Sequence, residues 1–142
     1  MIRRIFVDAD VILDLLLARQ PFFQAATELF LLIQDKQIEA WTSPLIFSNL
    51  FYILRKALSA PEAIAALRKL RLLVRLLPVD ERATDLALAS SFTDFEDAIQ
   101  YYAAVSGNLD ALVTRNKQDY RPAKLPILTA AECVALLRSE VE

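Results

Sequence analysis

The chain has 142 residues, of which 56% are hydrophobic and 24% are charged, and its formal net charge is −2. This length and composition predict one domain over residues 1–142 with a substantial core, and argue against a disordered chain. The sequence holds no histidine, one cysteine and one glycine. These absences exclude histidine-based catalysis, zinc clusters, P-loops and glycine-rich dinucleotide sites.

The sequence predicts a cytoplasmic protein that has no contact with a membrane. The N-terminus lacks the apolar core of a signal peptide, and its early apolar run contains an acid at Asp8. The longest apolar runs, such as Leu29–Ile33, are too short to cross a bilayer. The single cysteine, Cys133, cannot form an intramolecular disulfide, as is usual inside the cell.

Strands and helices alternate along the first half of the chain. The expected helix starts carry Ser, Asp or Pro, which cap or begin helices. In chain order we expect a strand over Ile2–Val7, a helix capped by Asp10 through Leu17, a helix from Pro21 to about Asp35, a strand over Ile38–Thr42, and a helix that is capped by Ser43 and runs to about Leu58.

The second half continues the alternation and contains three capping boxes, in which Ser or Thr is followed three residues later by Glu. In chain order we expect a helix from the box Ser59–Glu62, a strand over Leu76–Val79, a helix from Asp80 to about Ser90, a helix from the box Thr93–Glu96 to Gly107, a strand over Ala111–Thr114, a short strand near Ile127, and a last helix from the box Thr129–Glu132.

This order of elements predicts an α/β fold with three layers, α/β/α. Right-handed crossovers between successive strands give a central parallel sheet of about five strands with helices on both faces. In such sheets the functional site lies outside the carboxyl ends of the strands, near the point where the strand order reverses.

Acidic residues stand at three separate junctions that lead to this edge of the sheet. Asp8 ends the first strand, Asp94 and Asp97 share the first turn of one helix, and Asp119 follows the fourth strand. Each alone is explained as a turn residue or a helix cap. Gathered at one edge, however, unpaired carboxylates repel one another, and a divalent cation removes that repulsion. The sequence therefore predicts a site for a hard cation.

Three segments together resemble the motifs of PIN domains. Phe6–Asp14 is similar to the opening of the family, Asp94–Gln100 to its third acidic motif, and Val113–Tyr120 to its fourth. Their order and intervals make the resemblance specific, and it covers the whole chain. The likeness is greatest to the bacterial branch related to VapC-type toxins.

The resemblance implies an endoribonuclease that depends on Mg²⁺ or Mn²⁺ and is the toxin of a toxin–antitoxin pair. It implies that Asp8 and Asp97 are the metal ligands, and that Asp94 or Asp119 is a further ligand or orients water. The ion would lower the pKa of water and offset charge on the phosphate, so no histidine is needed. The expected partners are RNA, an antitoxin protein and a second copy in a homodimer.

Two positions depart from the usual pattern of the family. Asn49 stands where PIN nucleases commonly carry an acid, and Asn116 stands where they often carry Asp. We expect both, together with Thr114, to position a ligand, water or phosphate. Fewer carboxylates weaken a site for a hard cation, unless Asp14 or Asp119 compensates. The alternative function is therefore a PIN-fold module that binds RNA or a protein with little or no cleavage.

A second alternative comes from the segment Asp8-Ala-Asp10-Val, which also matches the opening of haloacid-dehalogenase-like phosphatases. In that chemistry the first Asp is a covalent nucleophile. Such enzymes usually have a larger chain, with a cap insertion and a lysine after a later strand. Turnover of p-nitrophenyl phosphate distinguishes the two families.

The basic residues are concentrated between Arg55 and Arg75, where six of them stand against one acid. Helical spacing places Arg68 and Arg71 on one face of the expected helix together with Arg75. An RNA backbone, an acidic antitoxin segment or solvent would each account for this face, and we expect Arg68 and Arg71 to bind RNA. The apolar face of the same helix is expected to hold Ile64, Leu67, Leu70 and Val74.

Overall fold

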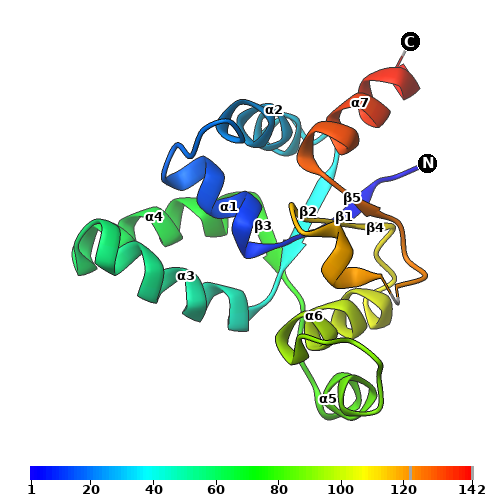
Figure 1. Cartoon of the computed structure of the whole chain (residues 1–142). Coiled ribbons are helices and arrows are strands. Elements are labelled where there is room, and N and C mark those ends of the chain that lie inside the picture. Colours follow the sequence, from blue (N-terminus) through cyan, green and yellow to red (C-terminus); the bar gives the residue numbers. More distant parts are fainter. Residues whose placement is uncertain (122, 142) are drawn as a thin grey trace.

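The computed structural model describes residues 1–121 and 123–141 (Figure 1). It contains a five-stranded sheet with the order β3-β2-β1-β4-β5, in which every neighbouring pair is parallel. The strands are β1 (Arg4–Val7), β2 (Glu39–Thr42), β3 (Val74–Leu76), β4 (Ala111–Val113) and β5 (Ile127–Leu128).

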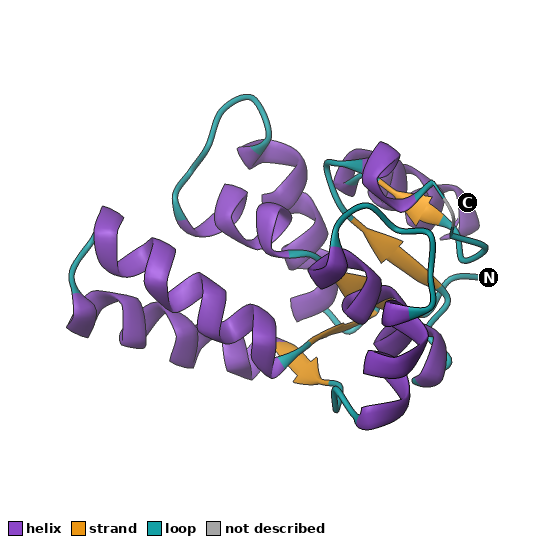
Figure 2. Ribbon diagram, turned by 60° about the horizontal axis from the view of Figure 1, so that its bottom comes forward, coloured by secondary structure: helices purple, strands orange, loops and turns teal. Residues whose placement is uncertain are grey.

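Helices cover both faces of this sheet. The helices α5 and α6 pack on each other on one face, and α1 to α4 and α7 form the layer on the other, in which α3 and α4 make a protruding hairpin (Figures 1 and 2). The predicted three-layer α/β/α fold is confirmed. Among the described residues, no helix is long and apolar enough to span a bilayer. The helices are α1 (Ala9–Leu16), α2 (Phe23–Gln34), α3 (Pro44–Ala57), α4 (Ala60–Leu73), α5 (Glu81–Leu88), α6 (Phe95–Ser106), the 3₁₀ helix η1 (Lys117–Tyr120) and α7 (Ala130–Val141).

The strand order reverses between β1 and β4. From β1 the chain adds β2 and then β3 on one side, and it returns to place β4 and β5 on the other side. Asp8 directly follows β1 and Thr114 directly follows β4, so both lie at the carboxyl edge of the sheet beside the switch point.

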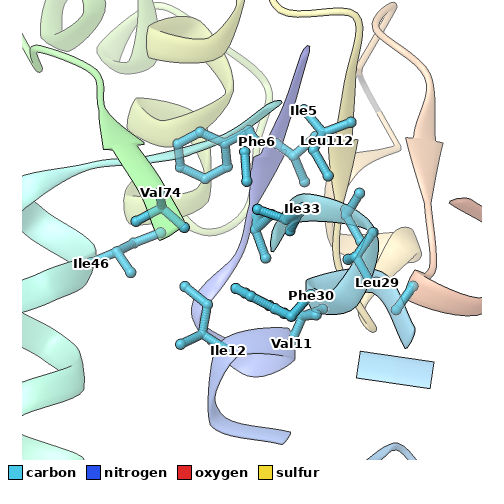
Figure 3. Packing of buried hydrophobic residues seen from close by; sticks show 14 of the residues in the cluster. Ile5, Phe6, Val11, Ile12, Leu29, Phe30, Ile33, Ile46, Val74 and Leu112 are labelled. Atoms are coloured by element: carbon cyan, nitrogen blue, oxygen red, sulfur yellow. The ribbon is translucent and has the colours of Figure 1, made fainter. Parts of the chain in front are cut away.

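The two central strands are buried on both faces, as continuous apolar runs in a parallel sheet require. Ile5, Phe6 and Val7 of β1 have no exposed surface, and the same holds for the three residues of β4. Figure 3 shows Ile12 and Phe30 from the helical layer among the side chains packed around β1. Each fully buried side chain of this kind stabilises the fold by about 1.5–3 kcal/mol. The core therefore holds the strand ends in fixed positions.

Several predicted helix caps are confirmed. Ser43 and Asp80 each accept a hydrogen bond from the backbone N–H three residues further on, at 3.2 and 2.9 Å. The box before α7 is complete, because Thr129 Oγ1 accepts from Glu132 N at 3.1 Å and Glu132 Oε1 accepts from Thr129 N at 2.8 Å. Gly107 directly follows the last residue of α6, as expected.

Two predicted caps are wrong by one or two residues. Asp8, not Asp10, caps α1 and accepts from the next backbone N–H at 2.8 Å. Asp94, not Thr93, caps α6 and accepts from the N–H three residues on at 3.0 Å. The cap follows from backbone conformation, since Asp8 and Asp94 are the last extended residues before each helix. Asp also caps helices better than Thr.

The second predicted helix begins later than expected. Phe22 N donates to Arg19 O at 3.1 Å and closes a turn, so Pro21 lies before the helix rather than in its first position. The helix starts at Phe23.

The predicted strand Leu76–Val79 lies too late in the sequence. The observed strand is Val74–Leu76, and Val74 pairs with Ala40 of β2 directly after α4 ends. Pairing in the sheet thus overrides the helical spacing that had placed Val74 on α4.

Candidate active site

Asp8 is fixed at the switch point of the sheet by its backbone and by its side chain. Its N–H donates to Val113 O at 2.9 Å, which extends the pairing of β1 with β4. Asp8 is 9% exposed, and its Oδ1 accepts from Ala9 N at 2.8 Å while its Oδ2 lies 3.0 Å from the Thr114 hydroxyl. The carboxylate therefore has a defined orientation at the carboxyl edge of the sheet.

A buried tyrosine joins Asp8 to an acid from another element. The hydroxyl of Tyr120, on η1, lies 3.1 Å from Asp8 Oδ2, 3.2 Å from Asp97 Oδ1 and 3.4 Å from Gln100 Oε1. Tyr120 is 1% exposed, and its ring meets that of Phe92 edge to face. The structure thus brings Asp8 and Asp97, from the end of β1 and the first turn of α6, to one hydroxyl group.

Asp10 lies on the other side of Thr114 and is held by the loop after β4. Asp10 Oδ2 accepts from Arg115 N at 3.0 Å and from Asn116 Nδ2 at 3.4 Å, and lies 3.2 Å from Thr114 Oγ1. Thr114 and Asn116, which were expected at the site, therefore lie there and contact acidic side chains.

The hydroxyl groups of Tyr120 and Thr114 lie near more acceptor oxygens than they can donate hydrogen bonds to. Tyr120 faces three acceptor oxygens and Thr114 faces two carboxylate oxygens, yet each hydroxyl carries only one proton. Oxygens left without a donor in a buried pocket are unfavourable unless a proton or a cation is close to them. The donor set of Asp8 and Asp97 consists of hard oxygen atoms, which fits a hard divalent cation.

The carboxyl groups of Asp8 and Asp97 have raised pKa values. Burial, and next the charge of Asp10, raises the pKa of Asp8 to about 6. Burial, and next the charges of Asp8, Asp94 and Asp119, raises the pKa of Asp97 to about 7. Each group is therefore costly to ionise without a compensating positive charge.

The same surroundings keep Tyr120 protonated. Burial and the two neighbouring carboxylates hold the pKa of its hydroxyl far above the ordinary range. Tyr120 is therefore available as a hydrogen-bond donor at neutral pH.

The remaining acids lie around this pair. Asp94 is the cap of α6, and Asp119 is a half-buried residue of η1. Within the part of the chain that the structure describes, no three acidic side chains are grouped closely enough to hold an ion. Mg²⁺ commonly keeps several waters and takes only one or two carboxylates from a protein, so a site for this ion does not require three grouped acids.

Asp14 is engaged in a separate interaction. Arg115 Nε lies 2.9 Å from Asp14 Oδ2, and the Arg115 guanidinium stacks on the ring of Phe22 at 4.1 Å from its centroid. Asp14 is buried, which raises the pKa of its carboxyl, while Arg115 opposes that rise. Asp14 is therefore paired with Arg115.

Asn49 is connected to the acids through a series of side chains. Asn49 Nδ2 donates to Glu96 Oε1, at 2.6 Å, and Gln100 Nε2 donates to the same oxygen at 3.2 Å. The amide oxygen of Gln100 then faces Tyr120. Asn49, on α3, thereby holds a carboxylate of α6 on the rim of the site.

The expected RNA-binding arginines lie on another part of the molecule. Arg71 Nη1 donates to Val74 O at 3.0 Å, and Val74 begins β3, whereas Asp8 lies at the carboxyl end of β1. The exposed Arg68 precedes Arg71 by nearly one turn of α4. The third arginine of this face, Arg75, lies 4.9 Å from the Trp41 ring centroid and 3.8 Å from Glu39.

Tyr120, Gln100 and Glu96 were not identified as site residues from the sequence. Gln100 follows Asp97 by three residues and Glu96 by four, which are the spacings of neighbours on one helix face, so the sequence contained a usable indication. Tyr120 stands at the end of the segment that resembles the fourth motif, but nothing in this polar stretch indicates that its hydroxyl faces the acids.

Comparisons with known proteins place these observations in a family. The sequence profile described as PIN domain matches residues 4–118. No curated protein sequence matches the chain. Among solved structures, 15 chains match. One belongs to VapBC2 from Rickettsia felis bound to a DNA fragment from its promoter, with 13% identity, a TM-score of 0.64, and coverage of 87% of this chain and 96% of that one.

Another is VapC20 from Mycobacterium tuberculosis, described as a Sarcin-Ricin loop cleaving toxin. It has 21% identity and a TM-score of 0.61, and the match covers 76% of this chain and 86% of that one. At these identities the likeness concerns the fold, while the matched profile extends over most of the sequence, including both acidic positions that meet at Tyr120. The chain belongs to the PIN domain family.

Proposed function

We propose that this protein is an endoribonuclease that uses Mg²⁺ or Mn²⁺, and that it is the toxin of a toxin–antitoxin pair. The observation that carries the proposal is the convergence of Asp8 and Asp97 on one buried hydroxyl at the switch point of the sheet. The cleaving activity in the description of VapC20 and the paired assembly of VapBC2 support it by analogy.

The residues of the site have distinct roles in this proposal. Asp8 and Asp97 would hold the ion, and Asp119, beside Asp97, would orient the attacking water. When bound, the ion supplies positive charge to the phosphate and acidifies water, which makes hydrolysis feasible at neutral pH without histidine. Thr114 fixes Asp8 through the contact of 3.0 Å, and Asn116 and the Arg115 N–H fix Asp10 next to it.

The direct test combines calorimetry with a cleavage assay. We expect the purified protein to bind Mn²⁺ and to cleave RNA of mixed sequence, and we expect a chelator to abolish cleavage. A protein that neither binds Mn²⁺ nor cleaves RNA contradicts the proposal. Binding of Mn²⁺ without cleavage of any RNA would instead favour the alternative of a catalytically weak binding module, which the neutral Asn49 supports.

Binding of Mn²⁺ should depend on pH. Protons compete with the ion for Asp8 and Asp97, whose pKa values are about 6 and about 7. We therefore expect Mn²⁺ affinity to rise steeply from about pH 5 to about pH 7 and to level off above that. Calorimetry in buffers of different ionisation enthalpy measures the protons released. An affinity that does not change over this range would contradict the assignment of these ligands.

Arg68 offers a test of where the RNA lies. We propose that a strand bound at the acidic site continues over α4 and meets this exposed arginine. Charge reversal, Arg68→Glu, should then lower the slope of log affinity against log salt by roughly 0.7 for single-stranded RNA. Arg75→Gln is the matched control, because Arg75 is already engaged with Trp41 and Glu39. An unchanged slope in Arg68→Glu places the RNA elsewhere.

For the protein partner we propose an antitoxin that binds the hairpin of α3 and α4. Exposed apolar side chains gather on this hairpin, among them Tyr52 at 59% and Ile53 at 40% exposure. Ile64, which we expect on the apolar face of α4, is also 40% exposed, because the buried face of α4 runs through Ala63, Leu67 and Leu70. Apolar groups displayed together favour a protein contact. We also expect the purified protein to form a homodimer, which light scattering measures.

A further inference from the structure

We infer that Tyr120 is a positioning residue of the metal site, whose hydroxyl holds the carboxylates of Asp8 and Asp97 together. This inference rests on the proposed function and adds to it a residue that is not an acid. The hydroxyl lies 3.1 and 3.2 Å from one oxygen of each carboxylate. Within the described residues no other hydrogen bond joins the elements that carry these two acids, so the tyrosine is their direct connection.

The environment of the hydroxyl fixes where it can donate. Glu96 Oε1 accepts from Gln100 Nε2, so the Gln100 amide presents its oxygen to Tyr120. Asn49 Nδ2 donates to the same Glu96 oxygen and holds that carboxylate in place. Tyr120 thus meets acceptors on every polar side and has no competing donor. Its proton must therefore go to a carboxylate or to the Gln100 oxygen beside them.

The burial of the ring makes this position rigid. Tyr120 is 1% exposed, and Phe92 meets its ring edge to face with 6.0 Å between centroids. A hydroxyl on a fixed ring cannot follow the carboxylates if they separate, so it defines their spacing. Side chains that hydrogen-bond to metal ligands and orient them commonly contribute about 10- to 100-fold to metal affinity.

The test is Tyr120→Phe, which removes the hydroxyl and keeps the ring. We expect Mn²⁺ affinity to fall about 10- to 100-fold while the melting temperature stays close to that of the wild type, a combination that a purely structural role would not give. Tyr101→Phe is the matched control. Tyr101 is also buried and also packs against Phe92, but its hydroxyl accepts from Lys124 N at 2.9 Å, so we expect wild-type affinity.

A second measurement needs no metal. In the metal-free protein a buried, hydrogen-bonded hydroxyl should give a slowly exchanging proton signal in NMR that is absent in Tyr120→Phe and present in Tyr101→Phe. Wild-type Mn²⁺ affinity in Tyr120→Phe, or the lack of this signal in the wild type, overturns the inference. A wild-type protein that shows the proton signal but binds no Mn²⁺ contradicts the proposed function alone.

Discussion

Replacing Asp97 by Asn should abolish Mn²⁺ binding and RNA cleavage and should also stabilise the metal-free protein. Asp97 shares the Tyr120 hydroxyl with Asp8, and burial and neighbouring charges raise its pKa to about 7. At about pH 8 the substitution removes the negative charge of Asp97 and so relieves its repulsion with the neighbouring carboxylate of Asp8. For a half-buried group we expect a gain of about 1–2 kcal/mol, or roughly 2–8 °C in melting temperature for a chain of this size.

The size of this stabilisation should depend on pH. The folded protein binds protons more tightly at Asp8 and Asp97 than the unfolded chain does, so stability is highest below about pH 4 for these groups and is lost as pH rises through about 6 and 7. The gain from Asp97→Asn should therefore shrink as pH falls below about 7 and vanish only below about pH 4, where the wild-type carboxyl is protonated in both the folded and the unfolded chain. Asp35→Asn, at an exposed site after α2, is the control and should change neither the Mn²⁺ affinity nor the melting temperature. Wild-type Mn²⁺ affinity in Asp97→Asn would rule out this ligand.

Replacing Arg115 by Ala should cause the largest loss of stability among the substitutions near the site. Arg115 Nε lies 2.9 Å from Asp14 Oδ2, and the two side chains are 30% and 2% exposed. Without Arg115 the carboxylate of Asp14 is left buried and unpaired. Breaking a pair of this kind costs about 3–5 kcal/mol, or roughly 6–20 °C in melting temperature for a chain of this size.

The partner substitution provides the control, because the two halves of the pair are not equivalent. In Asp14→Asn the remaining Arg115 keeps its stacking on Phe22 and can reach solvent, so we expect a smaller loss than in Arg115→Ala. The double variant should be more stable than Arg115→Ala, since the buried charge is gone. Equal losses from the two single substitutions would show that the ion pair does not account for the effect. Melting curves of all three variants decide this.

The order of elements and the layers of the fold were predictable from the sequence. Caps such as Ser43, Asp80 and the Thr129–Glu132 box are local signals, and the structure confirms them. The start of β3 was not predictable in the same way. Val74 continues the helical spacing of α4, and only its pairing with Ala40 of β2 makes it a strand residue.

The site residues also differ in whether a local sequence pattern or long-range packing determines them. The rule that ligands bind at the carboxyl edge of a parallel sheet indicated a group of acids, and the resemblance to PIN domains implied that Asp8 and Asp97 among them are the metal ligands. The structure brings these two to one hydroxyl. Which further side chains join them depends on packing between α3, α6 and η1. The sequence predicts that Glu96 belongs to a capping box. Its carboxylate instead accepts from Asn49 and Gln100, and no local sequence pattern reveals these two contacts.

The arrangement of the strands also determines when the site is completed during synthesis. Asp8 leaves the ribosome with the first strand, but β4, which pairs with β1, and the hydroxyls of Thr114 and Tyr120 come from the last third of the sequence. A growing chain therefore carries its first acid without the partners that orient it. The proposed metal site is therefore not assembled until β4 and η1 have been synthesised, and a shorter nascent chain lacks it.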